Sequence, residues 1–133
     1  MKAAAFAITL CAGLALAGCY EDETLTGYGA AENLWLLQSI DGQPYTARAT
    51  LEFPEAGTIA GQAPCNRFSG AQSAPYPWFS AERIAVTKMA CPELQDETLF
   101  LRALAEMTLV EVAGDTLLLT NDTGREMVFR AQE

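Results

Sequence analysis

The stretch that decides the fold is residues 47–63, which read ARATLEFPEAGTIAGQA. From Ala47 to Phe53 the odd-numbered residues are apolar and the even-numbered ones are polar. A period of two is typical of a strand that buries one face. Residues 54–57 supply turn-forming types, and residues 58–63 then lead back as the next strand. This stretch therefore predicts an antiparallel hairpin.

Short strands are also predicted on both sides of the hairpin. Upstream, residues 34–40 read LWLLQSI and end at Asp41-Gly42, a strong signal for a tight turn. Downstream, residues 75–79 carry two prolines, which exclude a central strand or a helix interior and indicate a loop. Apolar, strand-like runs predict the other strands at 65–72 (with an irregular entry), 83–88, 109–112, 116–119 and 126–130.

One helix is predicted, from about Pro92 to Met107. Proline suits the first turn of a helix, and acids such as Asp96 favour its positive end. Its apolar residues, Leu94, Leu101 and Leu104, share one face. The predicted fold class is α+β: a strongly curved antiparallel sheet of about seven short strands, nearly closed, with the helix covering one opening.

The N-terminus is typical of an export signal. One positive charge in Met1-Lys2 precedes an apolar stretch, residues 3–17, that is too short to span a bilayer as a helix. The stretch Leu16-Ala17-Gly18-Cys19 resembles the lipobox of bacterial lipoproteins, in which the cysteine thiol takes the lipid. The alternative is an ordinary secretory signal cleaved after Ala17 or Gly18, which leaves Cys19 as a spare thiol.

We therefore expect a signal peptide at 1–18, an acidic tether at 19–32 and one domain at 33–130. Several acyl chains on Cys19 would anchor the protein stably to a membrane. The next residue is Tyr20 and not aspartate, which by resemblance to the sorting of Gram-negative lipoproteins favours the outer membrane, facing the periplasm.

The net charge of the chain is −9. Loss of Lys2 with the signal leaves seven Lys and Arg against seventeen Asp and Glu, a net charge of about −10. Because such a surface repels phosphate backbones, we expect no nucleic-acid partner. We expect a monomer.

Cys65 and Cys91 are the two cysteines left for the domain once Cys11 is discarded with the signal and Cys19 takes a lipid. In an oxidising compartment they are predicted to form a disulfide. The rivals are a metal site or a redox pair. A chain without histidine cannot complete a typical zinc site, and a redox pair is more often Cys-x-x-Cys. We expect no metal and no cofactor.

No catalytic constellation stands out. The absence of histidine removes the commonest general base and excludes Ser-His-Asp and Cys-His sites. Glu93, Asp96 and Glu97 cluster at the expected helix start, which is the usual place for acids that favour the helix dipole. We therefore expect no enzyme.

The candidate binding residues are Asn66, Arg67, Tyr76 and Trp78. Asn66, Arg67 and Ser69 lie beside the expected disulfide and are able to bind an anion or a peptide carboxylate. The plainer alternative is that Asn66 bonds backbone in an irregular turn and Arg67 pairs with surface acids. The aromatic loop 75–79 is either an exposed contact patch or a plug over the end of the sheet. Trp35 is expected in the core.

An ordered series of motifs resembles the META domain, the HslJ-like family of small envelope proteins. The most specific stretch is Cys65-Asn66-Arg67-Phe68-Ser69-Gly70, which pairs with 84–91, IAVTKMAC. Proline at 64 and the proline-rich loop 73–79 depart from the pattern. The remaining matching stretches are Leu34-Trp35-x-Leu37 with Ile40-Asp41-Gly42, Leu51-x-Phe53 with Gly57-x-Ile59-x-Gly61, Phe100-Leu101-x-x-Leu104, Gly114-Asp115-x-Leu117-x-Leu119 and Met127-x-Phe129.

The resemblance implies an architecture and a place in stress-associated or surface-associated envelope biology, without an agreed enzymatic activity. Two functions follow as hypotheses. The first is a non-enzymatic, lipid-anchored envelope protein that contacts other envelope components, including a protein partner, and supports envelope integrity under stress. The second is a binding protein for a small hydrophobic ligand held in the open end of the sheet.

Overall fold

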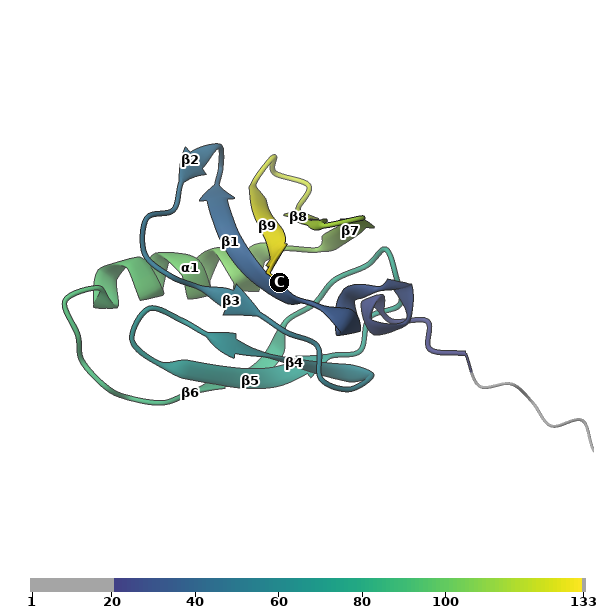
Figure 1. Ribbon diagram of the computed structural model, residues 1–133, viewed down its shortest axis with the longest axis horizontal. Coiled ribbons are helices and arrows are strands. Elements are labelled where there is room, and N and C mark those ends of the chain that lie inside the picture. The colour runs from purple at the N-terminus through teal and green to yellow at the C-terminus, as the bar shows by residue number, and fades with distance from the viewer. Residues whose placement is uncertain (1–20, 133) are drawn as a thin grey trace, which may run out of the picture.

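A computed structural model describes residues 21–132 and confirms the α+β class (Figure 1). The described chain contains nine strands in two sheets where we expected about seven in one, and the sheets do not close. In the first sheet the order is β2 (Gln43–Pro44), β1 (Leu34–Ile40), β9 (Glu126–Gln132), β8 (Thr116–Thr120) and β7 (Leu109–Ala113), and β3 (Thr50–Leu51) also pairs with β1. The second contains β4 (Gly57–Gln62), β5 (Arg67–Gln72) and β6 (Glu82–Val86).

The predicted hairpin at 47–63 forms the corner between the two sheets. Thr50 and Leu51 pair with β1, whereas Glu52 pairs with Ala60 of β4 through two backbone hydrogen bonds of 2.8 and 3.0 Å. The Gln62 amide also donates to Thr50 Oγ1 at 3.1 Å. Strand β3 is short because the chain changes partner directly after it, from β1 on one sheet to β4 on the other.

The α-helix α1 (Leu94–Glu106) runs behind β1 and β3 in Figure 1, between the two sheets. It buries Phe100, Ala103 and Leu104, while Leu94, which we placed on the same face, is 41% exposed. No helix within residues 21–132 has the length and apolar character needed to cross a bilayer. The helix joins one continuous core that also contains Leu37, Leu51, Phe53, Ile59, Phe68, Leu117, Leu119, Met127 and Phe129.

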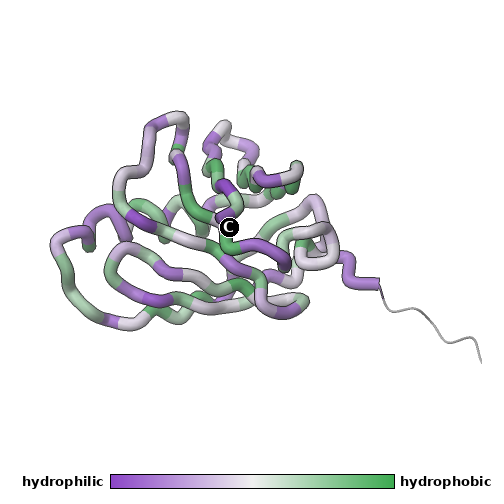
Figure 2. Tube along the Cα trace, in the orientation of Figure 1, coloured by the Kyte–Doolittle hydropathy of each residue, from purple (hydrophilic) through white to green (hydrophobic). Residues whose placement is uncertain are grey.

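Residues 24–32, which we expected within the tether, fold onto the domain. They form two 3-10 turns, η1 (Leu25–Tyr28) and η2 (Ala30–Glu32), and bury Leu25 and Ala30 completely. The Ala30 carbonyl accepts a hydrogen bond of 2.9 Å from the indole of Trp35, which lies in the core as predicted. A buried indole N–H needs an acceptor, so this segment completes the core. Figure 2 shows hydrophilic residues at the start of the described chain, beside the grey trace.

The loop at 75–79 lies along the outer edge of β7. Phe79 N donates to Thr108 O at 2.9 Å, and Val110 N donates to Pro77 O at 2.8 Å. The Tyr76–Pro77 peptide bond is cis. The loop therefore covers the backbone groups that an edge strand would otherwise expose. The predicted export signal at 1–18 and the predicted lipid site Cys19 lie outside the described residues.

Candidate functional site

The predicted disulfide joins Cys65, just before β5, to Cys91, just before α1. The two residues are 26 apart in sequence, and their Cα atoms are 5.7 Å apart. The Glu93 carboxylate lies close to both sulfurs. Because the sulfurs are bonded to each other, neither offers a thiolate to a metal ion. The bridge holds the entry to β5 against the start of the helix.

A buried polar cluster, the Asn66–Glu97 junction, adjoins this bridge. Each of the two side chains is only 3% exposed. Glu97 Oε1 accepts hydrogen bonds from the backbone amides of Cys65 and Asn66 at 3.1 and 2.7 Å. Glu97 Oε2 accepts one from Asn66 Nδ2 at 2.7 Å. The carboxylate therefore has partners on both oxygens, which is the condition under which burial of a charge is tolerated.

Asn66 extends the junction to the segment after β6. Its Nδ2 also donates to Met89 O at 3.0 Å, and its Oδ1 accepts from Met89 N at 2.6 Å and from Thr87 Oγ1 at 3.0 Å. Thr87 Oγ1 in turn accepts from Arg67 N at 3.1 Å. Among the described residues no buried side-chain polar atom lacks a partner. The amide of Asn66 is thus fully used inside the protein.

Glu97 is the buried acceptor of this cluster, a role that the sequence did not reveal. We interpreted it as a helix-start acid, but its partners lie 31 and 32 residues away in sequence. The available signal is its spacing. Residues 97, 100 and 104 recur at helical intervals on one face, and Phe100 and Leu104 are core residues. An acid in register with core residues needs buried partners.

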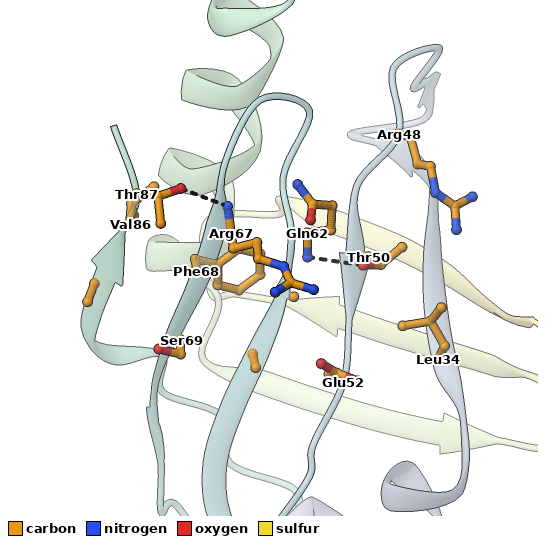
Figure 3. A pocket seen from close by; sticks show the side chains of 13 residues that line it. Leu34, Arg48, Thr50, Glu52, Gln62, Arg67, Phe68, Ser69, Val86 and Thr87 are labelled. Atoms are coloured by element: carbon orange, nitrogen blue, oxygen red, sulfur yellow. Dashed lines mark hydrogen bonds between the residues drawn. The ribbon is translucent and has the colours of Figure 1, made fainter. Parts of the chain in front are cut away.

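Arg67 faces the side of β5 that points away from the hydrophobic core. It lines an open hollow of about 670 Å³, which we call the β3–β6 groove (Figure 3). Because side chains alternate along a strand, Phe68 enters the core while Arg67 and Ser69 face the groove. The same alternation sends Leu51 inward and Thr50 and Glu52 outward. The groove residues are Leu34, Arg48, Thr50, Glu52, Ala60, Gly61, Gln62, Arg67, Phe68, Ser69, Ala85, Val86 and Thr87.

Two arginines give the groove its character. In Figure 3 Arg67 extends from β5 toward Thr50, and Arg48 lies on the far side of the groove. Within residues 21–132 neither arginine has an acid within ion-pair distance, although Glu52 lines the same groove. Thr50 and Thr87 already accept backbone hydrogen bonds. The two guanidinium groups suit carboxylate or phosphate oxygens, and they share the groove with the Glu52 carboxylate and the Ser69 hydroxyl.

Tyr76 and Trp78 belong to a different surface, the aromatic face (Tyr28, Tyr76 and Trp78). The Tyr76 ring stacks on Tyr28 with centroids 4.3 Å apart, and its hydroxyl accepts from Val112 N at 3.1 Å. Trp78 is 57% exposed, whereas Phe79 is buried. Each of the two alternatives for this loop therefore describes one of its residues. Phe79 is buried as a plug, and Trp78 is an exposed side chain. The four candidate binding residues do not form one site.

Asp41 and Tyr45, which lie outside the groove, are titratable groups whose pKa values are shifted by their surroundings. Hydrogen bonds from Arg125 (2.9 and 3.1 Å), and then from the Glu126 backbone, hold the pKa of the Asp41 carboxyl below its usual value. Arg125 also donates to Glu106 Oε2 at 2.8 Å. Burial, and then the nearby Asp96 and Glu97 charges, raise the pKa of Tyr45, whose hydroxyl donates to Asp96 O at 2.8 Å. Both groups brace the fold and neither enters the groove.

Comparison with known proteins gives a family and a fold. The family model that matches is that of the META domain, over residues 25–133. A search of curated protein sequences finds no match. An NMR structure is similar at 25% identity and a TM-score of 0.60, over 76% of this chain and 90% of the other.

Two further solved structures share the fold. An NMR structure of a protein from Burkholderia xenovorans has 24% identity and a TM-score of 0.63, over 81% of this chain and 86% of the other. The crystal structure of a DUF4847 family protein from Bacteroides vulgatus has 15% identity and a TM-score of 0.62, over 80% of this chain and 98% of the other. At these identities the likeness supports a common architecture.

Proposed function

The chain belongs to the META-domain family, and from this premise we propose that it is a lipid-anchored envelope protein that binds an acidic segment of a partner protein in the β3–β6 groove. The proposal has two parts, an anchor and a binding surface. Each is supported by separate residues, and each has its own test.

The anchor part is supported by the sequence. A charged start, an apolar core and Leu16-Ala17-Gly18-Cys19 are the features that export, cleavage and thioether formation require. In this proposal the mature protein begins at acylated Cys19 and lies on the outer membrane, facing the periplasm. Mass spectrometry of the mature N-terminus tests this part. An unmodified chain that starts elsewhere contradicts it.

The observation that carries the binding part is the presence in the groove of two arginines, Arg48 and Arg67, that form no ion pair with any acid within residues 21–132. The chain has a net charge of −9, so most of its surface repels acidic segments. Arg48 and Arg67 make the groove a local exception, and an arginine fork binds a carboxylate through two parallel hydrogen bonds. Small side chains at Ala60 and Ala85 leave room for a peptide to lie across the strands.

The proposed role is an interaction module without catalysis. It is supported by the absence of histidine from the sequence and by a groove that offers two guanidinium groups suited to binding. By resemblance to stress-associated members of the family, the partner is an envelope component whose integrity the protein supports. Binding through exposed arginines is weak and screened by salt, which suits a transient contact.

Crosslinking in intact cells tests the binding part. A photo-crosslinking residue at Ser69, which is exposed in the groove, is expected to capture a protein partner. The same residue at Ala105, exposed on α1, serves as the matched control. The Ser69 product should disappear with Arg67→Glu and persist with Arg102→Glu, which makes the same charge change on the helix. Equal products at both positions, or insensitivity to Arg67→Glu, contradict the proposal.

A second candidate function, binding of a small hydrophobic compound, is favoured by one hollow between α1 and the segment after β6. It measures about 430 Å³, within the usual range for ligand pockets, and Met89, Leu94 and Leu101 line it. Met89 is 66% exposed. The neutral fluorescent probe N-phenyl-1-naphthylamine should brighten with the protein and lose this signal with Met89→Lys, but not with the control Leu99→Lys. No brightening rejects this candidate.

A further inference from the structure

The aromatic face lies beside the end of the tether. Tyr76 N donates to the Glu23 carbonyl at 2.7 Å, and Thr24 forms a β-bridge with Pro75. Trp78 N then donates to Pro75 O at 2.8 Å, which closes the turn. Backbone contacts therefore fix Tyr76 and Trp78 next to the residues at which the tether ends.

The length of that tether limits how far the aromatic face is from the lipid. Three residues lie between Cys19 and Glu23, and the four Cα–Cα steps that join them span at most about 14 Å when the chain is fully extended. The headgroup region of a bilayer is itself roughly 5–8 Å thick on each side. A lipid on Cys19 thus holds the aromatic face at, or immediately above, the headgroups.

The chemistry of this face suits that place. Among the described residues the exposed large aromatic side chains are Tyr28, at 52%, and Trp78, at 57%, and both lie here. Tyrosine and tryptophan prefer the interface between water and lipid, because their rings are apolar at one end and polar at the other. We propose that Tyr28, Tyr76 and Trp78 sit in the headgroup region of the bilayer that holds the lipid on Cys19.

This inference rests on the lipid anchor of the proposed function and adds an orientation to it. The exposed acids Glu21 and Glu23 lie beside the aromatic face. Since they repel anionic headgroups, the contact favours zwitterionic lipid. The aromatic face then directs the domain toward the membrane and fixes the direction in which the β3–β6 groove is presented to a partner.

Tryptophan fluorescence tests the inference directly. The chain has two tryptophans, and Trp35 is fully buried, so the Trp78 signal is the difference between the natural protein and Trp78→Phe. The mature acylated protein is reconstituted in phosphatidylcholine vesicles with or without brominated acyl chains. Trp78 emission is expected to shift to the blue and to lose most of its intensity to the brominated lipid. Vesicles rich in phosphatidylglycerol should reduce both effects.

The matched control is Leu99→Trp in the Trp78→Phe background, which moves the exposed tryptophan to α1. Its emission should not respond to brominated lipid. If the protein floats with vesicles and Trp78 is not quenched, or if the Leu99→Trp control is quenched equally, the inference is overturned and the anchor stands. If mass spectrometry finds no lipid on Cys19, the anchor and the inference fail together. Crosslinks from position 78 to another protein or a second copy, in place of lipid, also overturn the inference.

Discussion

The Asn66–Glu97 junction and the β3–β6 groove meet between two consecutive residues, yet they treat polar groups in opposite ways. Asn66 is 3% exposed, and its side-chain amide forms hydrogen bonds with Glu97, Met89 and Thr87. Arg67 is exposed, and within residues 21–132 its guanidinium has no acid within ion-pair distance. One polar group is satisfied inside the fold and the other is available to a ligand.

The difference assigns separate tasks to the two regions. Breaking a buried, saturated network leaves polar groups without some of their partners and therefore costs stability. Changing an exposed, unpaired cation costs little stability but alters binding. Substitutions in the two regions should therefore have separable effects on stability and on binding.

Asn66→Ala removes the side-chain partner of Glu97 and all three hydrogen bonds to the segment at 87–89. The Glu97 carboxylate keeps only its two backbone donors, and the loss of one charge-assisted and three neutral hydrogen bonds should lower the free energy of unfolding by about 3–5 kcal/mol. Urea denaturation measures the fall. Arg67→Ala, one residue on, is the matched control and should change the free energy of unfolding by less than about 0.5 kcal/mol. Similar losses for both variants would remove the distinction.

Loss of the Cys65–Cys91 disulfide acts beside the same junction. The bridge closes a loop with a sequence separation of 26, and its removal should lower the free energy of unfolding by about 3.5 kcal/mol on the loop-entropy model. Cys65→Ala combined with Cys91→Ala, compared by urea denaturation with the oxidised protein, measures this. A reducing agent should reproduce the loss in the natural protein and leave the double variant unchanged. Free thiols in the untreated protein would contradict the bridge.

The Asp41–Arg125 pair is polar, paired and partly exposed, so it tests the intermediate case. Folding lowers the pKa of the Asp41 carboxyl below its ordinary value of 3.8. The ionised carboxylate therefore stabilises the folded protein at pH values above 3.8, and this stabilisation is lost as the pH falls through the lower pKa of the folded state. The effect is small, about 0.5 kcal/mol or less after screening by solvent. Thermal unfolding of Asp41→Asn should show a slightly lower Tm at pH 7 and no difference at pH 2. A Tm difference that persists at pH 2 would point to the turn itself.

Local patterns predicted most of the fold. The Asp41-Gly42 turn and the helix near 92–107 depend on neighbours in sequence, and each appears with small changes in its bounds. The strand predicted from the alternation at 47–53 is reduced to Thr50–Leu51, although the alternation still sends Leu51 and Phe53 into the core. Both turn residues adopt positive φ, as a tight turn of this type requires. The disulfide was predicted from the two cysteines that remain when Cys11 and Cys19 are assigned to the predicted export signal and the predicted lipid site.

Long-range pairing decided what the sequence did not show. Leu25 and Ala30 lie among polar residues, and nothing local indicates that Ala30 O is the acceptor for Trp35. Arg48 was not a candidate, because it joins Arg67 only through the placement of β4 between β3 and β5. The contacts of Glu97 with distant backbone amides depend on the order of the strands, and so does the groove that Arg48 and Arg67 share.

Binding at the groove is the central claim, and an NMR titration tests it most directly. A hexaglutamate peptide is added at low salt to the isotopically labelled domain as natural protein, as Arg67→Glu and as the charge-matched Arg102→Glu. If the peptide binds in the groove, saturable amide shifts should be confined to β3, β4, β5 and β6 around it. Arg67→Glu should abolish these shifts, and Arg102→Glu should retain them. The absence of shifts in the natural protein, or shifts that survive Arg67→Glu, would contradict the claim.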